Sequence, residues 1–211
     1  MTGVIPRWRR LSMHPLMRPL TERRIGLRWR IAGRPIPPPP IVKQALVKAY
    51  QRRFDLRVFV ETGTFAGEMI AAVADRFDRV ISIELDAAWH AKAVERFGAR
   101  AGMTLLHGDS GVRLREVLVS LAEPALFWLD AHYAGPLTAR GMLDSPIVRE
   151  LDAIRAHPVA GHVVLIDDMR YFTGTDGYPR AVDLVQWIRS DEPRGSVEIR
   201  DDILRWHMRM A

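Results

Sequence analysis

The stretch Val58-Phe-Val-Glu61-Thr-Gly63-Thr-Phe-Ala-Gly67 decides the fold of this chain. Its apolar start, Val58–Val60, predicts a short buried strand, and the apolar spacing over Met69–Phe77 predicts a helix. The two glycines between them allow a tight turn and let a ligand approach the backbone closely. The order of strand, glycine turn and helix indicates the beginning of an α/β domain.

The same alternation continues toward the C-terminus. Further strands are predicted at Val80–Ile83, Thr104–Leu106, Ala125–Leu129 and His162–Ile166, with helices between them. Alternating strands and helices imply a mostly parallel sheet covered on both faces. Ser196–Arg200 and Ile203–Met208 then alternate around Asp201-Asp202, which predicts a hairpin. We therefore predict a doubly wound, mostly parallel, seven-stranded sheet that ends in an antiparallel hairpin.

Composition narrows the class of protein. The chain has 211 residues, of which 48% are hydrophobic and 27% charged, so it can fill the core of one globular domain. No apolar run approaches the ~20 residues that a transmembrane helix needs. The absence of cysteine excludes a disulfide framework, a zinc ribbon, a thiol nucleophile and an iron–sulfur site. These features fit a cytoplasmic protein.

Positive charge is concentrated near the N-terminus. Residues 1–57 carry a net charge of +12, whereas the remainder carries −6. The proline run 37–40 stops any helix that precedes it, so we place an Arg- and Pro-rich arm at residues 1–40 and a domain at 41–211. Apolar residues at helical spacing after the prolines predict an amphipathic helix at the start of that domain.

Two roles are open for the arm. Arginine and tryptophan together can bind an anionic partner, either lipid or RNA. Alternatively, the arm packs on its own acidic domain, with Trp8 and Trp29 against the body. We favour the second role.

Every predicted parallel strand ends in an acidic residue. These residues are Glu61, Glu84, Asp109, Asp130 and Asp167. Parallel strands bring their carboxyl ends to one edge of the sheet, where like charges destabilise a fold unless a ligand or cation uses them. The five carboxylates therefore predict a shared functional cleft, although Asp109 taken alone also suits a helix cap.

The glycine turn argues against a dinucleotide cofactor. Phe65 stands where the G-x-G-x-x-G pattern requires glycine, so NAD is disfavoured. Glu84 ends the second strand and is suited to accept hydrogen bonds from the ribose hydroxyls of a nucleoside.

These motifs resemble class I S-adenosylmethionine-dependent methyltransferases, in particular a bacterial subgroup of small members. The resemblance covers about residues 41–211 and implies a Rossmann-like fold with adenosylmethionine as cofactor. It gives Glu61, Gly63 and Gly67 contacts to the methionine end of the cofactor, Glu84 contacts to the ribose, and Asp109 contacts to the adenine. Many members have a further glycine at the position of Phe65.

A weaker similarity is to metal-dependent O-methyltransferases of the catechol, caffeoyl and macrocin types. Asp130, Asp167 and Asp168 fall on the positions of their metal ligands. Oxygen ligands suit Mg²⁺ or another divalent cation, which would orient the acceptor and lower its pKa. Alternatively, the Asp167-Asp168 pair caps a turn and Asp130 positions the amine of the cofactor.

The combined expectation is methyl transfer from adenosylmethionine to an oxygen of a small polar acceptor, such as a sugar or a hydroxylated metabolite. Asp130 and His132 are the predicted catalytic residues; His132 suits either a general base or a tether for its loop. The alternatives are a metal-dependent hydrolase that uses Asp130, Asp167 and Asp168, and a non-catalytic binding protein on a methyltransferase fold.

Overall fold

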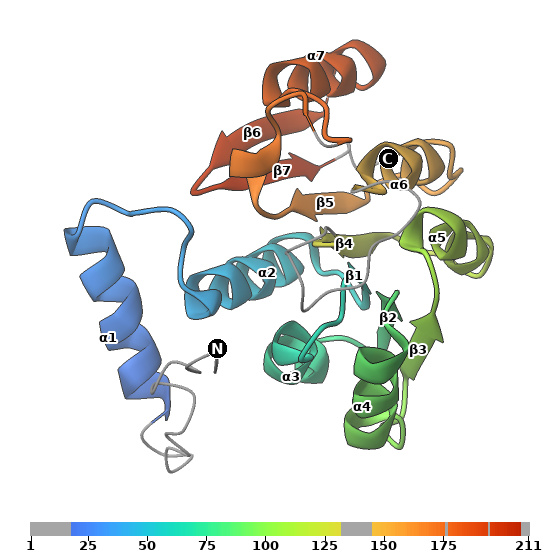
Figure 1. Cartoon of the computed structure of the whole chain (residues 1–211), viewed down its shortest axis with the longest axis horizontal. Helices are drawn as coiled ribbons and strands as arrows, with labels where there is room; N and C mark the ends of the chain where they lie inside the picture. The colour runs from blue at the N-terminus through green and yellow to red at the C-terminus, as the bar shows by residue number, and fades with distance from the viewer. Residues whose placement is uncertain (1–17, 132–144, 176, 194, 208–211) are drawn as a thin grey trace, which may run out of the picture.

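A seven-stranded sheet with the strand order β3-β2-β1-β4-β5-β7-β6 forms the centre of the chain (Figure 1). The computed structural model describes residues 18–131, 145–175, 177–193 and 195–207. Strands β1 to β5 pair in parallel, and β7 runs antiparallel to both β5 and β6. The predicted mostly parallel sheet with a terminal antiparallel hairpin is confirmed.

The strands lie within a few residues of their predicted bounds. They are β1 (Val58–Thr62), β2 (Arg79–Glu84), β3 (Met103–His107), β4 (Ala125–Leu129), β5 (Val163–Ile166), β6 (Ser196–Arg200) and β7 (Ile203–His207). Strands β1, β4 and β5 are buried along their whole length. This burial explains why they read as apolar runs rather than as alternating patterns.

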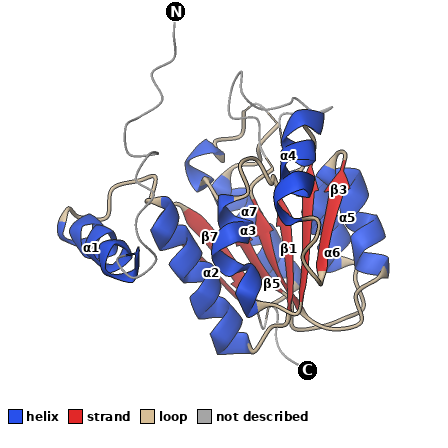
Figure 2. Cartoon of the chain, turned by 90° about the horizontal axis from the view of Figure 1, so that it is seen from below, coloured by secondary structure: helices blue, strands red, loops and turns tan. Residues whose placement is uncertain are grey.

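Helices cover both faces of the sheet (Figure 2). In chain order the helices are α1 (Arg18–Ile31), which does not cover the sheet, α2 (Pro40–Phe54), α3 (Glu68–Val73), α4 (Ala87–Phe97), α5 (Ser110–Val119), α6 (Ile147–Arg155) and α7 (Ala181–Asp191), with short 3-10 turns η3 (Ala74–Arg76) and η4 (Met169–Tyr171). One core cluster joins the sheet to α5, α6 and α7, and a second joins it to α2 and α3. The chain is therefore doubly wound.

Side chains of successive residues in the central strands pack into the two core clusters on opposite faces of the sheet. Val60 and Phe127 are paired in register and belong to the cluster with α5 and α6, whereas Phe59 and Trp128 belong to the cluster with α2 and α3. All four side chains are at most 1% exposed. This alternation fixes the register of β1 and β4, because a shift by one residue would exchange the two cores.

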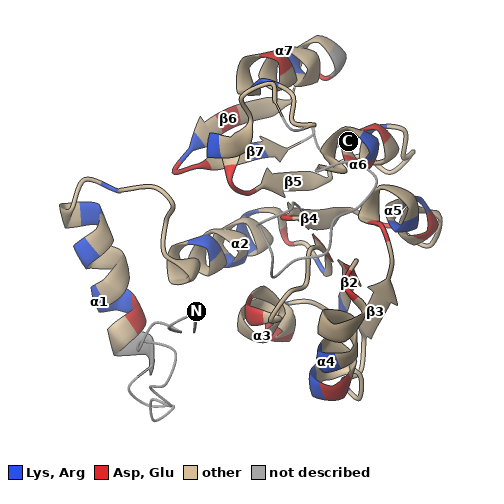
Figure 3. Cartoon of the chain, viewed as in Figure 1, with Lys and Arg blue, Asp and Glu red and all other residues tan. Residues whose placement is uncertain are grey.

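The described part of the arm contains a helix that the sequence did not predict. Helix α1 lies beside α2 and away from the sheet (Figure 1), and lysines and arginines lie along both helices (Figure 3). Trp29 is buried, and its Nε1 donates a hydrogen bond to the Pro35 carbonyl at 2.8 Å. Arg34 pairs with Asp201 in the β6–β7 turn at 2.5 Å. The arm before residue 18, including Trp8, lies outside the described residues.

Within the residues that the structure describes, no helix has the length and apolar character needed to cross a membrane.

A core substitution in α5 tests the packing of the face that α5, α6 and α7 cover. Leu114 is completely buried between α5 and the sheet, whereas Val119, on the same helix, is 89% exposed. Leu114→Ala should lower the free energy of unfolding by about 2–5 kcal/mol, because it removes buried methyl groups and leaves a cavity. Val119→Ala should change it by less than about 0.5 kcal/mol. Urea unfolding followed by circular dichroism measures both, and equal effects would contradict this packing.

Candidate functional site

The candidate site lies where the strand order reverses. The chain passes from β1 outward to β2 and β3, then returns to β4 on the other side of β1. Loops after β1 and β4 therefore diverge at the carboxyl ends of adjacent strands, which leaves a crevice in which open α/β sheets bind ligands. The predicted acidic residues sit at the ends of these strands.

The turn after β1 needs both of its glycines. Gly63 and Gly67 have φ angles of 84° and 68°, in the left-handed region. A Cβ atom on Gly63 would lie 2.5 Å from the carbonyl oxygen of Asp130, and one on Gly67 would lie 2.5 Å from the Phe97 ring. The expected tight turn is confirmed, and it is pressed against the end of β4.

Phe65 has a left-handed backbone conformation, which glycine adopts at lower energetic cost than other residues. Its φ is 45°, and its ring lies 4.4 Å from the Trp89 ring, centroid to centroid. The Phe65 backbone N–H donates to Glu84 Oε2 at 2.7 Å. The departure from the glycine pattern therefore leaves the turn intact and adds an aromatic pair beside it.

Glu84 joins the turn after β1 to the loop after β2. One oxygen accepts from Phe65 N, and the other accepts from Asp86 N at 2.8 Å. Asp86 in turn caps α4 by accepting from Ala88 N and Trp89 N. A side chain that the sequence singled out for a ligand thus also organises the backbone around it.

Glu61 is an almost fully buried acid at the end of β1. Its Oε2 accepts a hydrogen bond from Ser82 Oγ at 2.7 Å, and Ser82 Oγ lies 2.6 Å from Thr64 Oγ1. Burial, together with the charges of Asp130 and Glu84, raises the pKa of Glu61 to about 8 against the opposing effect of the Ser82 hydrogen bond. Glu61 is therefore largely protonated at neutral pH.

Asp130, Asp167 and Asp168 come together as the sequence predicted. Each offers one carboxylate oxygen, and these oxygens lie within 4.8 Å of one another. Asp167 and Asp168 are buried, and Asp130 is half-buried. We call these three residues the acidic cluster.

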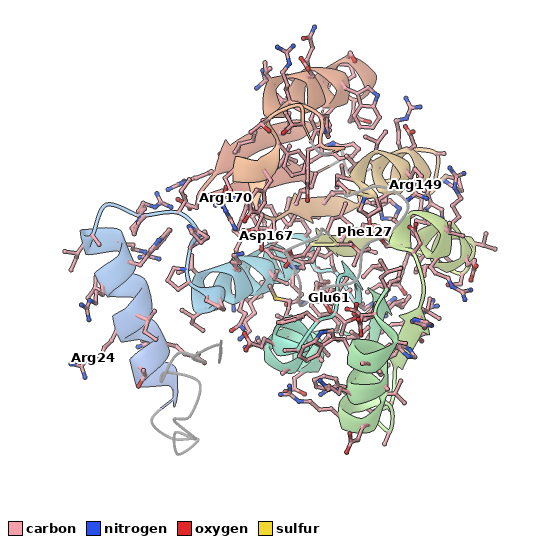
Figure 4. All side chains as sticks on the ribbon, in the orientation of Figure 1. Arg24, Glu61, Phe127, Arg149, Asp167 and Arg170 are labelled. Atoms are coloured by element: carbon pink, nitrogen blue, oxygen red, sulfur yellow. The ribbon has the colours of Figure 1, made fainter. Side chains whose placement is uncertain are left out.

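Two cations from outside the predicted site neutralise this cluster. Lys43 of α2 places Nζ in contact with Asp167 Oδ2 and 3.2 Å from Asp168 Oδ1. Arg170 of η4 donates to Asp168 Oδ1 at 2.6 Å and also contacts Asp202, which lies in the β6–β7 turn. Asp167 and Arg170 lie close together near the centre of the molecule in Figure 4. Neither Lys43 nor Arg170 was predicted from the sequence as part of the site.

The charges of the cluster act on one another strongly. Burial lowers the pKa of Lys43, but the carboxylates of Asp167, Asp168 and Asp130 outweigh this and raise it above its ordinary value. Burial and the neighbouring charge of Asp130 raise the pKa of Asp167, against the effect of Lys43. Lys43 therefore stays charged in a buried position.

A small cavity of about 160 Å³ opens between α2, the glycine turn and the acidic cluster. Lys43 and Gln44 line it from α2, and Glu61, Asp130 and Asp167 line it from the strand ends. Its walls thus combine charged groups with apolar side chains, among them Met69 and Trp128.

The acid after the third strand has a structural partner. Asp109 caps α5 by accepting from Gly111 N at 2.8 Å and pairs with Arg149 of α6 at 3.0 Å. It does not line the cavity formed by the described residues. The capping alternative for Asp109 is therefore confirmed, whereas its contact with a ligand stays a prediction.

Glu150 is a buried acid that was not predicted from the sequence as a residue of the site. It is 1% exposed and belongs to α6. Burial is the main cause that raises its pKa to about 7, against the effect of Ser110. Glu150 lies at helical spacing from the buried residues Ile147 and Ile154, and this spacing was the sequence signal that could have predicted its burial.

His132, one of the two predicted catalytic residues, lies outside the described residues. Asp130, the other, lines the cavity.

The donor chemistry of the acidic cluster taken alone suits a hard divalent cation. Asp167 and Asp168, however, already hold Lys43 in this structure, and Asp168 also holds Arg170. Metal binding by the three aspartates stays a prediction.

Glu61 makes stability depend on pH. An unfolded glutamate releases its proton near pH 4.3, whereas folded Glu61 keeps it to about pH 8. Stability from this residue is thus fully present below the unfolded pKa and is lost as the pH rises through the folded one. Glu61→Gln should therefore match the native chain at pH 4 and exceed it at pH 8 by at least about 1 kcal/mol, which corresponds to ~2–4 °C.

Thermal unfolding at several pH values measures this difference. Glu95→Gln, on the exposed face of α4, is the matched control and should keep the native pH dependence. Parallel curves for the native chain and Glu61→Gln would show that Glu61 is ionised in the folded protein.

Comparisons with known proteins give a clear result at the level of structure. No family model matches the chain, and no curated protein matches its sequence. Solved structures of methyltransferases, by contrast, match it over most of their length.

The O-methyltransferase from Bacillus cereus in complex with SAH superposes with a TM-score of 0.58 and 15% identity, over 95% of this chain and 94% of that one. SAH-bound methyltransferase PaMTH1 from Podospora anserina gives 0.55 and 14%, over 100% of both chains. The O-methyltransferase TomG from Streptomyces achromogenes, in complex with SAM, gives 0.54 and 15%, over 89% of both. The chain has the fold of class I methyltransferases, and the resemblance seen in its motifs is confirmed at that level.

Proposed function

We propose that this chain is an S-adenosylmethionine-dependent methyltransferase that acts on an oxygen of a small polar acceptor. The observation that carries the proposal is the glycine turn after β1, held by Glu84 at the end of β2 and facing an acidic cavity at the reversal of strand order. The neighbouring solved structures include O-methyltransferases bound to SAM or SAH, which supports both the reaction and the cofactor.

The cofactor would lie across the carboxyl ends of β1 and β2. Glu84 uses one lone pair on each oxygen for backbone N–H groups, so further lone pairs are available to the two ribose hydroxyls. Gly63 and Gly67 are the two positions of the turn without a side chain, and we place the methionine end beside them. Glu61 and Asp130 provide carboxyl groups there. We assign the adenine to the side of Asp109.

The acceptor would occupy the cavity between α2 and the acidic cluster. Bound adenosylmethionine would supply a methyl group activated by its positive sulfur. The acceptor oxygen would take this methyl group as the carbon–sulfur bond breaks, and the acceptor would release one proton. Asp130 lines the cavity and is the carboxylate that we assign to receive this proton. The chain supplies mainly alignment, as an in-line displacement requires.

The two alternatives have less support. A metal-dependent hydrolase would need open coordination positions at the acidic cluster, where Lys43 and Arg170 bind. A non-catalytic binding protein is consistent with the fold but is not favoured by the comparisons, since the neighbouring structures are of methyltransferases.

Calorimetric titration with adenosylhomocysteine tests the cofactor. The native chain should bind it, and Glu84→Ala should weaken binding at least about tenfold, because the ribose hydroxyls lose their acceptors and the turn loses its support. Glu95→Ala, which removes an exposed carboxylate from α4, should bind as the native chain does. A folded native protein that binds no adenosylhomocysteine at millimolar concentration would refute the proposal.

For the arm we propose an intramolecular role, with a domain boundary near residue 40. The support is the burial of Trp29 and the ion pair between Arg34 and Asp201. Trp29→Ala should lower the midpoint of thermal unfolding by several degrees, because it removes a large buried side chain. Leu27→Ala, on the same helix but 58% exposed, should have little effect.

An anionic partner for the arm makes a different prediction. The native chain would then bind anionic vesicles or RNA with an affinity that falls steeply as salt increases. Such binding, together with an unchanged unfolding midpoint in Trp29→Ala, would overturn the intramolecular role.

A further inference from the structure

Lys43 occupies a position that its own helix does not favour. It lies in the first turn of α2, where the positive end of the helix dipole disfavours a cation, and that turn contains no acidic residue to offset it. Its side chain is 17% exposed, and burial of a charged amine is costly unless the amine is paired. The contacts with Asp167 and Asp168 are the compensation that the structure shows.

The helix delivers Lys43 to the cluster through packing that does not involve the acids. Val47 and Tyr50 are buried between α2 and the sheet, and Gln44 Nε2 donates to the Glu68 carbonyl of α3 at 3.3 Å. The first turn of α2 is thereby fixed over the ends of β1 and β4. Lys43 is held in place before any ligand arrives.

The ammonium group and a divalent metal ion compete for the same carboxylates. Lys43 Nζ contacts Asp167 Oδ2 and Asp168 Oδ1. These two residues would supply two of the three carboxylate ligands that the acidic cluster offers to a metal ion. A metal ion bound there would either displace Lys43 or lie against a second positive charge at low dielectric. With Lys43 and Arg170 present, two positive charges already face three carboxylates.

We propose that Lys43 is the resident cation of the acidic cluster, so that the site binds and orients its acceptor oxygen without a divalent metal ion. The part of this inference that concerns the acceptor rests on the proposed function. An ammonium group carries three hydrogens, of which Asp167 and Asp168 account for two. The third is directed to an acceptor oxygen in the cavity, which Lys43 lines together with Asp130.

Titration with Mn²⁺, followed by the paramagnetic resonance signal of the free ion, tests the resident cation without any assay of activity. The native chain should bind no Mn²⁺ at the cluster up to millimolar concentration. Lys43→Ala should gain a site at least about tenfold tighter than any in the native chain, because three carboxylates lose a neutralising charge. Adding Asp130→Asn to Lys43→Ala should abolish that site.

Lys48→Ala is the matched control, because it removes a lysine from the same helix at a position that does not contact the cluster. It should leave Mn²⁺ binding as in the native chain. Tight Mn²⁺ binding by the native chain that Asp168→Asn removes would overturn the proposal, and this arm needs no variant at Lys43 to fold. Failure of folded Lys43→Ala to gain a site would overturn it as well.

The acceptor part has its own measurements. Lys43→Met should lower kcat/KM for the acceptor while leaving adenosylhomocysteine affinity within about twofold, and EDTA should leave native turnover unchanged. Loss of turnover in EDTA, restored by Mg²⁺, would refute metal independence. A native chain that binds neither adenosylhomocysteine nor Mn²⁺ would refute the proposed function and leave Lys43 as the resident cation.

Discussion

Crowding of carboxylates at the carboxyl ends of β1, β4 and β5 is the constraint on which the rest of the site depends. Glu61, Asp130 and Asp167 share one small cavity, and two of them are nearly inaccessible to water. A fold tolerates such crowding when an acid keeps its proton or when a cation is brought to it. This chain does both, with a protonated Glu61 and with Lys43 against Asp167.

The terminal hairpin takes part in the same balance of charge. Its turn residue Asp202 is buried and contacts Arg170, which in turn binds Asp168. Backbone groups join the same two segments. Arg170 N donates to Asp202 Oδ1 at 2.7 Å, and Met169 N donates to the Asp202 carbonyl at 2.9 Å. The antiparallel strands are therefore more than an edge of the sheet: they fix the loop that follows β5.

Much of this architecture follows from local patterns in the sequence. Buried parallel strands leave apolar runs, and the turn after β1 requires glycine at Gly63, because a Cβ atom would collide with the backbone of Asp130. The gathering of the acidic cluster was predictable because parallel strands end at one edge. Lys43 was not, since its spacing in α2 fits a solvated helix face equally well, and its contacts depend on how α2 crosses the sheet.

Other gaps have the same physical cause. Helix α1 has no apolar stripe, so no periodic signal marks it, and buried Trp29 contacts Arg34 and Pro35, which lie beyond the end of its helix. Arg170 follows an acidic pair in the sequence, which is typical of a surface charge. Its contact with Asp202 of the hairpin turn becomes evident only in the folded chain. Long-range pairing of charges leaves no trace at short sequence separation.

The position of α2 sets what counts as the smallest complete unit of this protein. A fragment that began at β1 would retain all seven strands and every carboxylate that lines the cavity, yet it would lack Lys43 and the helix turn that covers the cavity. The sheet and the electrostatically balanced site thus have different N-terminal limits. Any shortened form or chimera of this fold that preserves the chemistry has to start before Pro40, at the proline run itself.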